Sequence, residues 1–421
     1  MTQYTHTLLR PAEWVLPGHP DKLADAIADS LVQAAVEREA EALCAIEVAV
    51  HRDAVFLTGR LACEGSDQID LRGLVKEVYR SAGYGDRWRP APDDIQVLGN
   101  LCVDTLVRDE ASVRHISDDQ SIVTGYAIDL PGLGYLPPEQ WIARELALAL
   151  YRLVDSPMQL CPDGKVLVVM EESPDGANGA GCARRLRSVS ASLLAPDAVS
   201  GVELQRAVVL AVKELLQLAA TLLPGLSAEM PGEIVVNGSG SFHMGGPEGD
   251  NGLSGKKLLL DYYGPRVPIG GSALSGKDFH KPDRAGAIIA RRLALAVVQT
   301  GVAEDATVHL ASFPGDEAPR ILRIATPEGD LREPQRWRHL VDCRFKSIPR
   351  QDETVDLVQA ARWGHWGHGG PRERLGGEID GTDRRSQRMA SCSPVSSNWD
   401  DDSMTKKVPF VRGPEKRRIS E

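Results

Sequence analysis

Two short glycine-rich stretches of the sequence each carry lysine directly after a Ser-Gly pair. The first, "LSGKK", ends in Lys256 and Lys257, and the second, "LSGKD", places Lys277 before Asp278. Glycine-rich loops let backbone N–H groups and lysine ammonium groups approach a phosphate chain closely. Because the two loops lie close together in the sequence, we expect both to contribute cations to one polyphosphate rather than to be solvated turns.

The second loop also matches the glycine and lysine spacing of a P-loop, from Gly271 to Gly276 and Lys277. In a P-loop, a buried strand precedes the glycines, and a Ser or Thr that binds magnesium follows the lysine. Here two prolines interrupt the preceding stretch "YYGPRVPIGG", and Asp278 follows the lysine. A plain P-loop nucleotide hydrolase remains an alternative only if "VPIGG" forms a buried strand.

Carboxylates and a histidine near two predicted helix starts could bind phosphate and a metal ion. Pro282 suits the first turn of a helix that we expect to run to about Thr300, so Asp283 would lie at the N-terminus of this helix. Helix N-termini bind anions, and a carboxylate there could hold a metal that bridges to phosphate. In "GHPDK", His19 and Asp21 precede another apolar helix and could contact phosphate and Mg²⁺. The alternative for Asp21 is a simple helix cap.

Glu47 lies within the apolar stretch "CAIEVAV", which we predict to be a strand. A carboxylate on the buried face of this strand would need a partner or a bound cation. On the exposed face it would carry no function. Sequence alone leaves both possibilities open.

The composition narrows the possible classes of protein. The chain has 421 residues, of which 42% are hydrophobic and 25% charged, and its formal net charge is -11. This excess of acidic over basic residues argues against a general nucleic-acid-binding protein. No uninterrupted apolar stretch is long enough to span a membrane, and the N-terminus lacks the pattern of a signal peptide. Seven cysteines without CxxC spacing suggest reduced thiols and a cytoplasmic protein.

Helices and strands alternate along the chain in three similar blocks. We therefore predict an α/β (α+β) fold with three similar domains around a pseudo-threefold axis. The N-terminal domain would span residues 1–103, the central domain 115–230 and the C-terminal domain 231–383. Residues 384–421 are rich in serine and contain blocks of like charge, which predicts a disordered tail.

In this combination and order, the motifs resemble the S-adenosylmethionine synthetase (methionine adenosyltransferase) family. The matching stretches, between about Leu16 and Pro371, are "GHPDKLADAIAD", "DDQSIVTGYA", "CPDGKVLV", "MGGPEGDNGLSGKKLLLDYYG", "GGSALSGKDFHKPDRAGAIIAR" and "ARWGHWGHGGP". The resemblance implies a three-domain enzyme that forms S-adenosylmethionine from ATP and L-methionine and releases phosphate and pyrophosphate. It also implies Mg²⁺ and K⁺ as cofactors, and a homodimer or tetramer whose active sites lie between subunits.

The same resemblance implies a role for each site residue. The catalytic groups would be His19, Lys165 and Lys277. Further ATP contacts would come from Asp119, Asp163, Phe242, Asp250, Lys256, Lys257 and Ala273. Mg²⁺ would be bound by Asp21 and Asp283, and K⁺ by Glu47. The amino acid would contact Asp250, Lys281, Arg60 and Asp104.

The sequence departs from the family mainly on the amino-acid side. The family's strand Glu is Arg60 here, the Gln that opens its active-site loop is Asp104 in a shorter loop, and a phosphate-contacting Arg is Ser241. We hypothesise that Arg60 and Asp104 form an ion pair across the pocket. The chain would then be an ordinary methionine adenosyltransferase, a paralogue that uses another amino-acid nucleophile, or a non-catalytic nucleotide-binding partner subunit.

Overall fold

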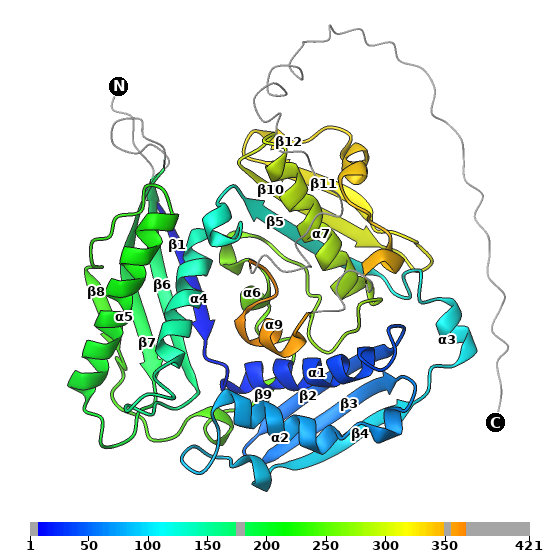
Figure 1. Ribbon diagram of the computed structural model, residues 1–421. Coiled ribbons are helices and arrows are strands. Elements are labelled where there is room, and N and C mark those ends of the chain that lie inside the picture. Colours follow the sequence, from blue (N-terminus) through cyan, green and yellow to red (C-terminus); the bar gives the residue numbers. More distant parts are fainter. Residues whose placement is uncertain (1–6, 174–181, 349–354, 368–421) are drawn as a thin grey trace, which may run out of the picture. The chain divides into compact units, whose positions relative to one another are not determined.

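The computed structural model describes residues 7–173, 182–348 and 355–367. These residues form three four-stranded sheets, and helices pack against each of them (Figure 1). The predicted α/β class with three similar units is confirmed. The tail predicted at 384–421 lies outside the described residues. In the described part, no helix combines the length and apolarity needed to cross a membrane.

The first sheet is built around the hairpin of two strands, one of which is the strand predicted around Glu47. Its strands, in sheet order, are β4 (Gln96–Asp104), β3 (Ala54–Ala62), β2 (Leu43–His51) and β9 (Gly252–Leu253). β2 and β3 are antiparallel, whereas β4 runs parallel to β3. The short strand β9 reaches this sheet from far along the chain and pairs with β2. This pairing brings the first lysine-bearing loop to the N-terminal sheet.

Two helices cover one face of the first sheet, α1 (Pro20–Val36) and α2 (Leu71–Ala82). The apolar stripe of α1, formed by Leu23, Ile27 and Leu31, is fully buried. This burial holds α1 against β2 and leaves the N-terminus of α1, with its polar residues, next to β9.

The second sheet includes a strand that the sequence patterns do not predict. Its strands, in sheet order, are β1 (Leu8–Val15), β6 (Gly164–Ser173), β7 (Ala183–Leu193) and β8 (Glu233–Val236). β1 pairs only with β6, so the missing N–H group of Pro11 is tolerated at the sheet edge. The helices α4 (Pro138–Tyr151) and α5 (Gly201–Leu222) complete this unit.

The third sheet combines the end of the chain with one strand from its middle. Its strands, in sheet order, are β12 (Gly329–Asp330), β11 (Arg320–Thr326), β10 (Asp305–Ser312) and β5 (Ser121–Ile128). The helix α7 (Pro282–Gln299) packs on β5 and β10, close to its predicted bounds of 282 and 300. At Gly125 of β5, a Cβ atom would lie 2.1 Å from the backbone of Ala290, so only glycine allows this close approach.

Strand pairing crosses the linear domain boundaries of the sequence prediction. β1 pairs with β6, β5 pairs with β10, and β9 pairs with β2, so each sheet includes a strand from another block. The boundaries 1–103, 115–230 and 231–383 stay a prediction. The exchanged strands tie the three units together.

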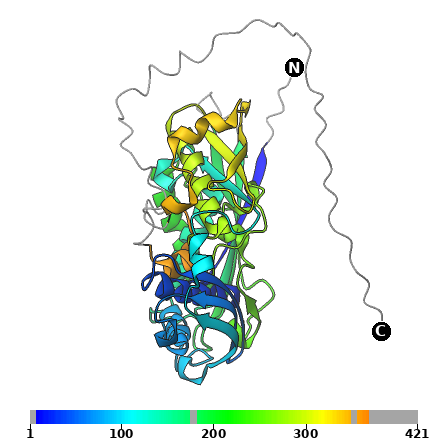
Figure 2. The same ribbon diagram turned by 90° about the vertical axis from the view of Figure 1, so that its right-hand side faces the viewer.

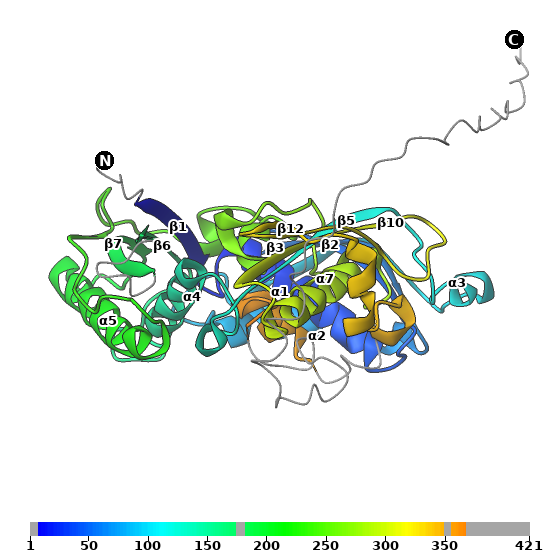
Figure 3. The same cartoon turned by 90° about the horizontal axis from the view of Figure 1, so that it is seen from above.

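A segment near the end of the described chain packs among the three units. It comprises α9 (Leu357–Trp363) and residues 364–367, and α9 lies against α1 (Figure 1). The ring of Trp363 contacts Tyr151 edge-on, and the ring of Trp366 stacks on Tyr263. Figure 2 and Figure 3 show helices gathered on one side of the sheets, which leaves the other face of each sheet uncovered by helices in the described part.

Candidate functional site

The two lysine-bearing loops adopt the same local geometry on helix α1. Gly255 and Gly276 have φ values of 70° and 85°, in the left-handed region that favours glycine. The Gly255 N–H donates to Asp25 Oδ1 at 2.8 Å, and the Gly276 N–H donates to Asp29 Oδ1 at 2.9 Å. A Cβ on Gly255 would lie 2.8 Å from the Cβ of Ala273, so the loops touch each other.

The lysines of these loops lie beside the two carboxylates predicted to bind Mg²⁺. Lys256 Nζ is 3.7 Å from Asp21 Oδ1, and Lys257 Nζ is 3.4 Å from Asp21 Oδ2. Lys277 forms an ion pair with Asp283. We call Lys256, Lys257 and Lys277 the lysine cluster. It places three cations on adjoining loops, beside carboxylates in the first turns of α1 and α7.

His19 lies at the N-cap of α1, where its Nδ1 accepts the Asp21 N–H at 3.2 Å. Burial lowers the pKa of His19 to about 4; Asp21 opposes this shift, and the ammonium groups of Lys257 and Lys165 reinforce it. His19 is therefore neutral at pH 7, and it is close enough to both lysines to respond to their charge.

Asp163, next to the start of β6, joins the second sheet to the loop that precedes the lysine cluster. Its Oδ2 accepts the Gly246 N–H at 2.7 Å, whereas Lys165, the second residue of β6, is exposed. Burial raises the pKa of Asp163 to about 6. Asp250 is exposed, and its carboxylate accepts the Asn251 N–H. The structure thus brings "CPDGK" and "MGGPEGD" together from distant parts of the chain.

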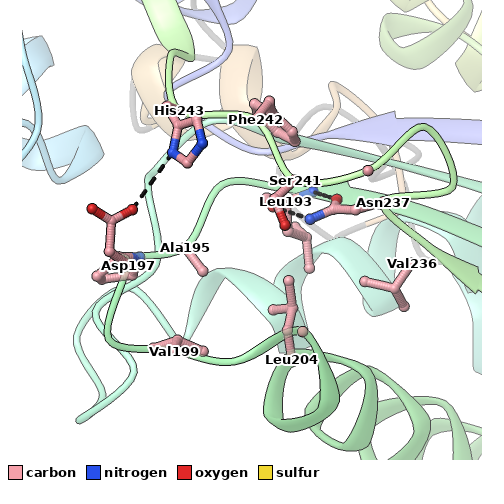
Figure 4. A pocket seen from close by; sticks show the side chains of 13 residues that line it. Leu193, Ala195, Asp197, Val199, Leu204, Val236, Asn237, Ser241, Phe242 and His243 are labelled. Carbon is pink, nitrogen blue, oxygen red and sulfur yellow. Dashed lines mark hydrogen bonds and ion pairs between the residues drawn. The ribbon is translucent and has the colours of Figure 1, made fainter.

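A cavity of about 340 Å³ opens beside this loop, between the ends of β7 and β8 and the start of α5 (Figure 4). Its walls include the apolar side chains of Leu193, Val199, Leu204 and Val236, together with Phe242 and Ser241. His243 Nδ1 lies 3.5 Å from Asp197 Oδ1. Sequence reasoning identified Phe242 but missed the cavity, because most of its walls come from ordinary apolar residues.

Asp278, the residue after Lys277, has a structural role that excludes the P-loop alternative. Its side chain is fully buried, with Oδ2 accepting the Cys44 N–H at 2.7 Å and Oδ1 accepting the His280 N–H at 2.8 Å. Arg114 forms a buried ion pair with the same carboxylate. Residues 267–271 form no strand, so the P-loop alternative is wrong.

The ion pair predicted between Arg60 and Asp104 is present, and it has a third member. Arg60 donates to Asp104 Oδ1 at 3.2 Å and to Glu110 Oε2 at 2.9 Å. Glu110 belongs to the short helix α3 (Arg108–Ser112), and its carboxylate also accepts the Val107 N–H. Sequence reasoning missed Glu110, because no local pattern indicates which face of this short helix meets β3.

Backbone pairing places this ion triad next to the lysine cluster. Ala45 of β2 is the cross-strand partner of Arg60, and it also forms an isolated bridge with Lys277. The other predicted amino-acid ligand, Lys281, donates to Asp118 Oδ2 at 2.6 Å. In the part of the chain that the structure describes, Lys281 forms no ion pair with Asp250, its predicted companion.

Two of the predicted residues lie on exposed surfaces. Glu47 faces outward from β2 and accepts a hydrogen bond from Ser254, the serine of the first lysine-bearing loop. Asp119 is exposed, and its carboxylate accepts the Gln120 N–H at 2.7 Å. In the described ranges, neither carboxylate contacts the lysine cluster.

The donor set suits a magnesium ion that is shared with a phosphate chain. No group of three or more metal-binding side chains occurs among residues 7–173, 182–348 and 355–367. Mg²⁺ is usually bound through one or two carboxylates together with substrate phosphates. Asp21 and Asp283 offer such carboxylates beside the lysine cluster. Glu47 and the Ser254 hydroxyl together offer a cation fewer oxygen ligands than Asp21 and Asp283 do.

Two family models match the chain, and between them they include the lysine cluster. The model of the S-adenosylmethionine synthetase N-terminal domain matches residues 7–101, and that of the C-terminal domain matches residues 244–365. An S-adenosylmethionine synthase of Thermus thermophilus is 30% identical over 384 residues, which cover 85% of this chain and 93% of that protein. The Petrotoga mobilis synthase is 32% identical over 389 residues, with coverages of 86% and 94%. S-adenosylmethionine synthase 1 of Rhodopseudomonas palustris is 31% identical over 402 residues, with coverages of 91% and 98%.

The low pKa of His19 predicts a pH-dependent contribution to stability. Between pH 4 and about 6.5 the unfolded chain binds a proton at this position that the folded protein does not bind. The stability that neutral His19 provides is therefore present above about pH 6.5 and is lost as the pH falls toward 4. We expect the difference in unfolding free energy between wild type and His19→Gln to grow as pH rises through this window, measured by urea unfolding. Equal pH slopes for the two proteins would contradict the assignment.

Proposed function

Because the chain belongs to the S-adenosylmethionine synthetase family, we propose that it forms S-adenosylmethionine from ATP and L-methionine and releases phosphate and pyrophosphate. The single observation that supports this proposal best is the lysine cluster, held by two loops of equal geometry beside Asp21 and Asp283. A polyphosphate leaving group requires such fixed positive charge.

In the proposed reaction, the methionine sulfur attacks the ribose C5′ of ATP. A C–S bond forms, the C5′–O bond breaks, and the triphosphate leaves with the electron pair. One water then hydrolyses the triphosphate to pyrophosphate and phosphate. The thioether sulfur carries no proton, so the site needs cations at the departing oxygen more than a general base. We assign this role to Lys165 and the lysine cluster, with neutral His19 as a hydrogen-bonding partner of the phosphate chain.

We assign Mg²⁺ to Asp21 and Asp283, and K⁺ to Glu47. A Mg²⁺ ion bound there would supply Lewis-acid neutralisation of the phosphate oxygens. Asp21 is 2% exposed, and it is fixed by the Leu253 N–H at 3.1 Å. Asp283 is fixed by the Ser272 hydroxyl at 2.7 Å. Both carboxylates are therefore held in place before any metal arrives.

We place the adenine base at the mouth of the cavity beside Phe242. Its apolar walls and its volume of about 340 Å³ suit a planar base, and an aromatic side chain at the rim can stack on it. Asp163, Asp250, Ala273 and Asp119 are the further nucleotide contacts in this proposal. Asp163 accepts the Gly246 N–H and so fixes the chain between Phe242 at the cavity and the lysine cluster.

The ion triad of Arg60, Asp104 and Glu110 favours a second candidate, in which the same chemistry uses a different amino-acid nucleophile. Two carboxylates and one guanidinium carry a net charge of −1, which can attract an ammonium group. Lys281 would contact the substrate carboxylate. A non-catalytic partner subunit is the third candidate, and the reaction assay below separates it from the other two.

We also propose a homodimer that buries the uncovered sheet faces. On the first sheet, Phe56 is 48% exposed and its cross-strand partner Leu98 is 52% exposed. Ile122 of β5 is 62% exposed. Apolar side chains on an uncovered sheet face suit an interface between two copies of the chain. Glu47 and Lys165 are exposed at positions that such an interface would enclose.

Replacing Lys277 tests the adenosyltransferase reaction. Removing one cation that contacts the leaving group should lower kcat by roughly 10²–10³-fold for Lys277→Met. The measurement is S-adenosylmethionine formation coupled to phosphate release from ATP, with and without methionine. Lys213→Met, an exposed lysine on α5, is the matched control and should keep wild-type rates. Absence of product and of phosphate release in wild type, with every thioether amino acid tried, would support the partner subunit instead.

Replacing Arg60 tests the amino-acid side separately. We expect Arg60→Gln to raise the KM for the amino acid by about tenfold or more, because Asp104 and Glu110 lose the guanidinium that fixes their positions, while the KM for ATP changes little. The control is Arg323→Gln on β11, which removes an exposed ion pair between Arg323 and Asp330. A panel of thioether amino acids identifies the preferred substrate. An unchanged methionine KM in Arg60→Gln would remove Arg60 from the substrate site.

The proposed dimer predicts a specific effect of charge on the first sheet. Leu98→Glu would bury a carboxylate in the interface, so we expect this variant to sediment as a monomer and to lose activity. Leu210→Glu places the same charge on α5, at a residue that is 55% exposed, and it should remain dimeric. Sedimentation of Leu98→Glu at the wild-type rate, as a dimer, would contradict this interface.

A further inference from the structure

Helix α1 presents three buried aspartates at intervals of one turn, and each accepts a backbone N–H from the glycine-rich loops. We call Asp21, Asp25 and Asp29 the aspartate row. Asp21 accepts from Leu253, whereas Asp25 and Asp29 accept from Gly255 and Gly276. All three aspartates are at most 2% exposed. Sequence analysis assigned a role only to Asp21.

Buried cations neutralise the inner two aspartates. Lys22 donates to Asp25 Oδ2 at 3.1 Å, and Arg284 forms an ion pair with Asp29. Lys22 is 0% exposed and Arg284 is 1% exposed, so neither can reach a ligand in solvent. Asp25 and Asp29 thus have buried cationic partners apart from the lysine cluster, although Lys22 is shared with Asp261.

The loops are pressed tightly onto the elements that carry the aspartate row and its neighbours. A Cβ on Gly252 would lie 2.1 Å from the backbone of Pro20 in α1. A Cβ on Gly276 would lie 2.1 Å from the carbonyl oxygen of Ile46 in β2. Each loop therefore has little room to shift along α1 while its hydrogen bond to the aspartate is intact.

We propose that Asp25 and Asp29 are positioning residues, whose one-turn separation sets the distance between the two lysine-bearing loops so that both face one polyphosphate. One turn of α-helix advances about 5.4 Å. Since the Gly255 and Gly276 N–H groups bind successive turns, Lys256 and Lys277, which directly follow these glycines, are held at a matching separation. This inference rests on the proposed function, because it takes the triphosphate of ATP as the shared anion.

If Asp25 and Asp29 only stabilised the fold, replacing them would lower stability without a specific loss of anion affinity. The test therefore compares two variants that have the same charge and differ at one acceptor. Asp25→Asn keeps an oxygen that can accept the Gly255 N–H, whereas Asp25→Ala does not. Both keep Lys22, which still donates to Asp261. The probe is inorganic tripolyphosphate with Mg²⁺, titrated calorimetrically into the full-length protein.

We expect tripolyphosphate to bind about tenfold more weakly to the alanine variant than to the asparagine variant, as loss of one loop-fixing hydrogen bond predicts. Hydrogen exchange should rise in residues 252–257 of the alanine variant and stay unchanged in residues 272–277. The control Asp70→Ala removes a comparable bond, from the Gly73 N–H to an exposed N-cap carboxylate on α2. This control should lower the melting temperature without changing tripolyphosphate affinity.

Equal tripolyphosphate affinities in the asparagine and alanine variants would overturn the positioning role, provided that wild type binds the probe. If wild type neither binds tripolyphosphate nor forms S-adenosylmethionine, the proposed function fails, and the shared-anion inference fails with it. If the alanine variant does not fold, Asp25→Glu replaces it, because it keeps the charge and moves the acceptor by one methylene group. Wild-type affinity in Asp25→Glu, with unchanged exchange in residues 252–257, would also overturn the proposal.

Discussion

The site depends on buried carboxylates that bind backbone N–H groups of loops far away in the sequence. Burying a carboxylate is costly unless hydrogen bonds and a cation compensate for the lost hydration. Asp25 has both, through Gly255 and Lys22, yet burial still raises the pKa of Asp25 to about 7. Burial alone would lower the pKa of Lys22, but Asp261 and Asp25 raise it above its ordinary value. Helix α1 is therefore a charged core element whose charges are satisfied only in the correct loop arrangement.

This constraint separates two layers of charge. The inner layer pairs Asp25 with Lys22 and Asp29 with Arg284, out of reach of solvent. In the outer layer, the lysine cluster lies beside Asp21 and Asp283; Lys256 is exposed, whereas Lys257 and Lys277 are only partly exposed. In the proposed function, a polyphosphate and its metal ion would interact with this outer layer while the inner ion pairs stay intact.

Local sequence patterns predicted much of the fold. They predicted the helices α1 and α7, and the repeated "LSGK" pattern predicted that the two loops act together; the loops do touch, at Gly255 and Ala273. β1 was missed because Pro11 weakens its strand pattern, and β5 because it contains Gly125. The roles of Asp25 and Asp29 were missed for another reason: their partners, Gly255 and Gly276, are 230 and 247 residues away. Only the tertiary pairing of β9 with β2 and of Lys277 with Ala45 reveals these contacts.

The residues proposed to bind the amino acid belong to a different network from those proposed to bind phosphate. The ion triad holds α3 to β3 through Arg60 and Glu110, and neither residue bonds to the aspartate row in the described structure. Its connection to the lysine cluster is the backbone of Ala45. Because backbone pairing does not depend on the side chain of residue 60, a change from carboxylate to guanidinium there alters the local charge without displacing Lys277. A fold arranged in this way can change its amino-acid partner while it keeps the same leaving group.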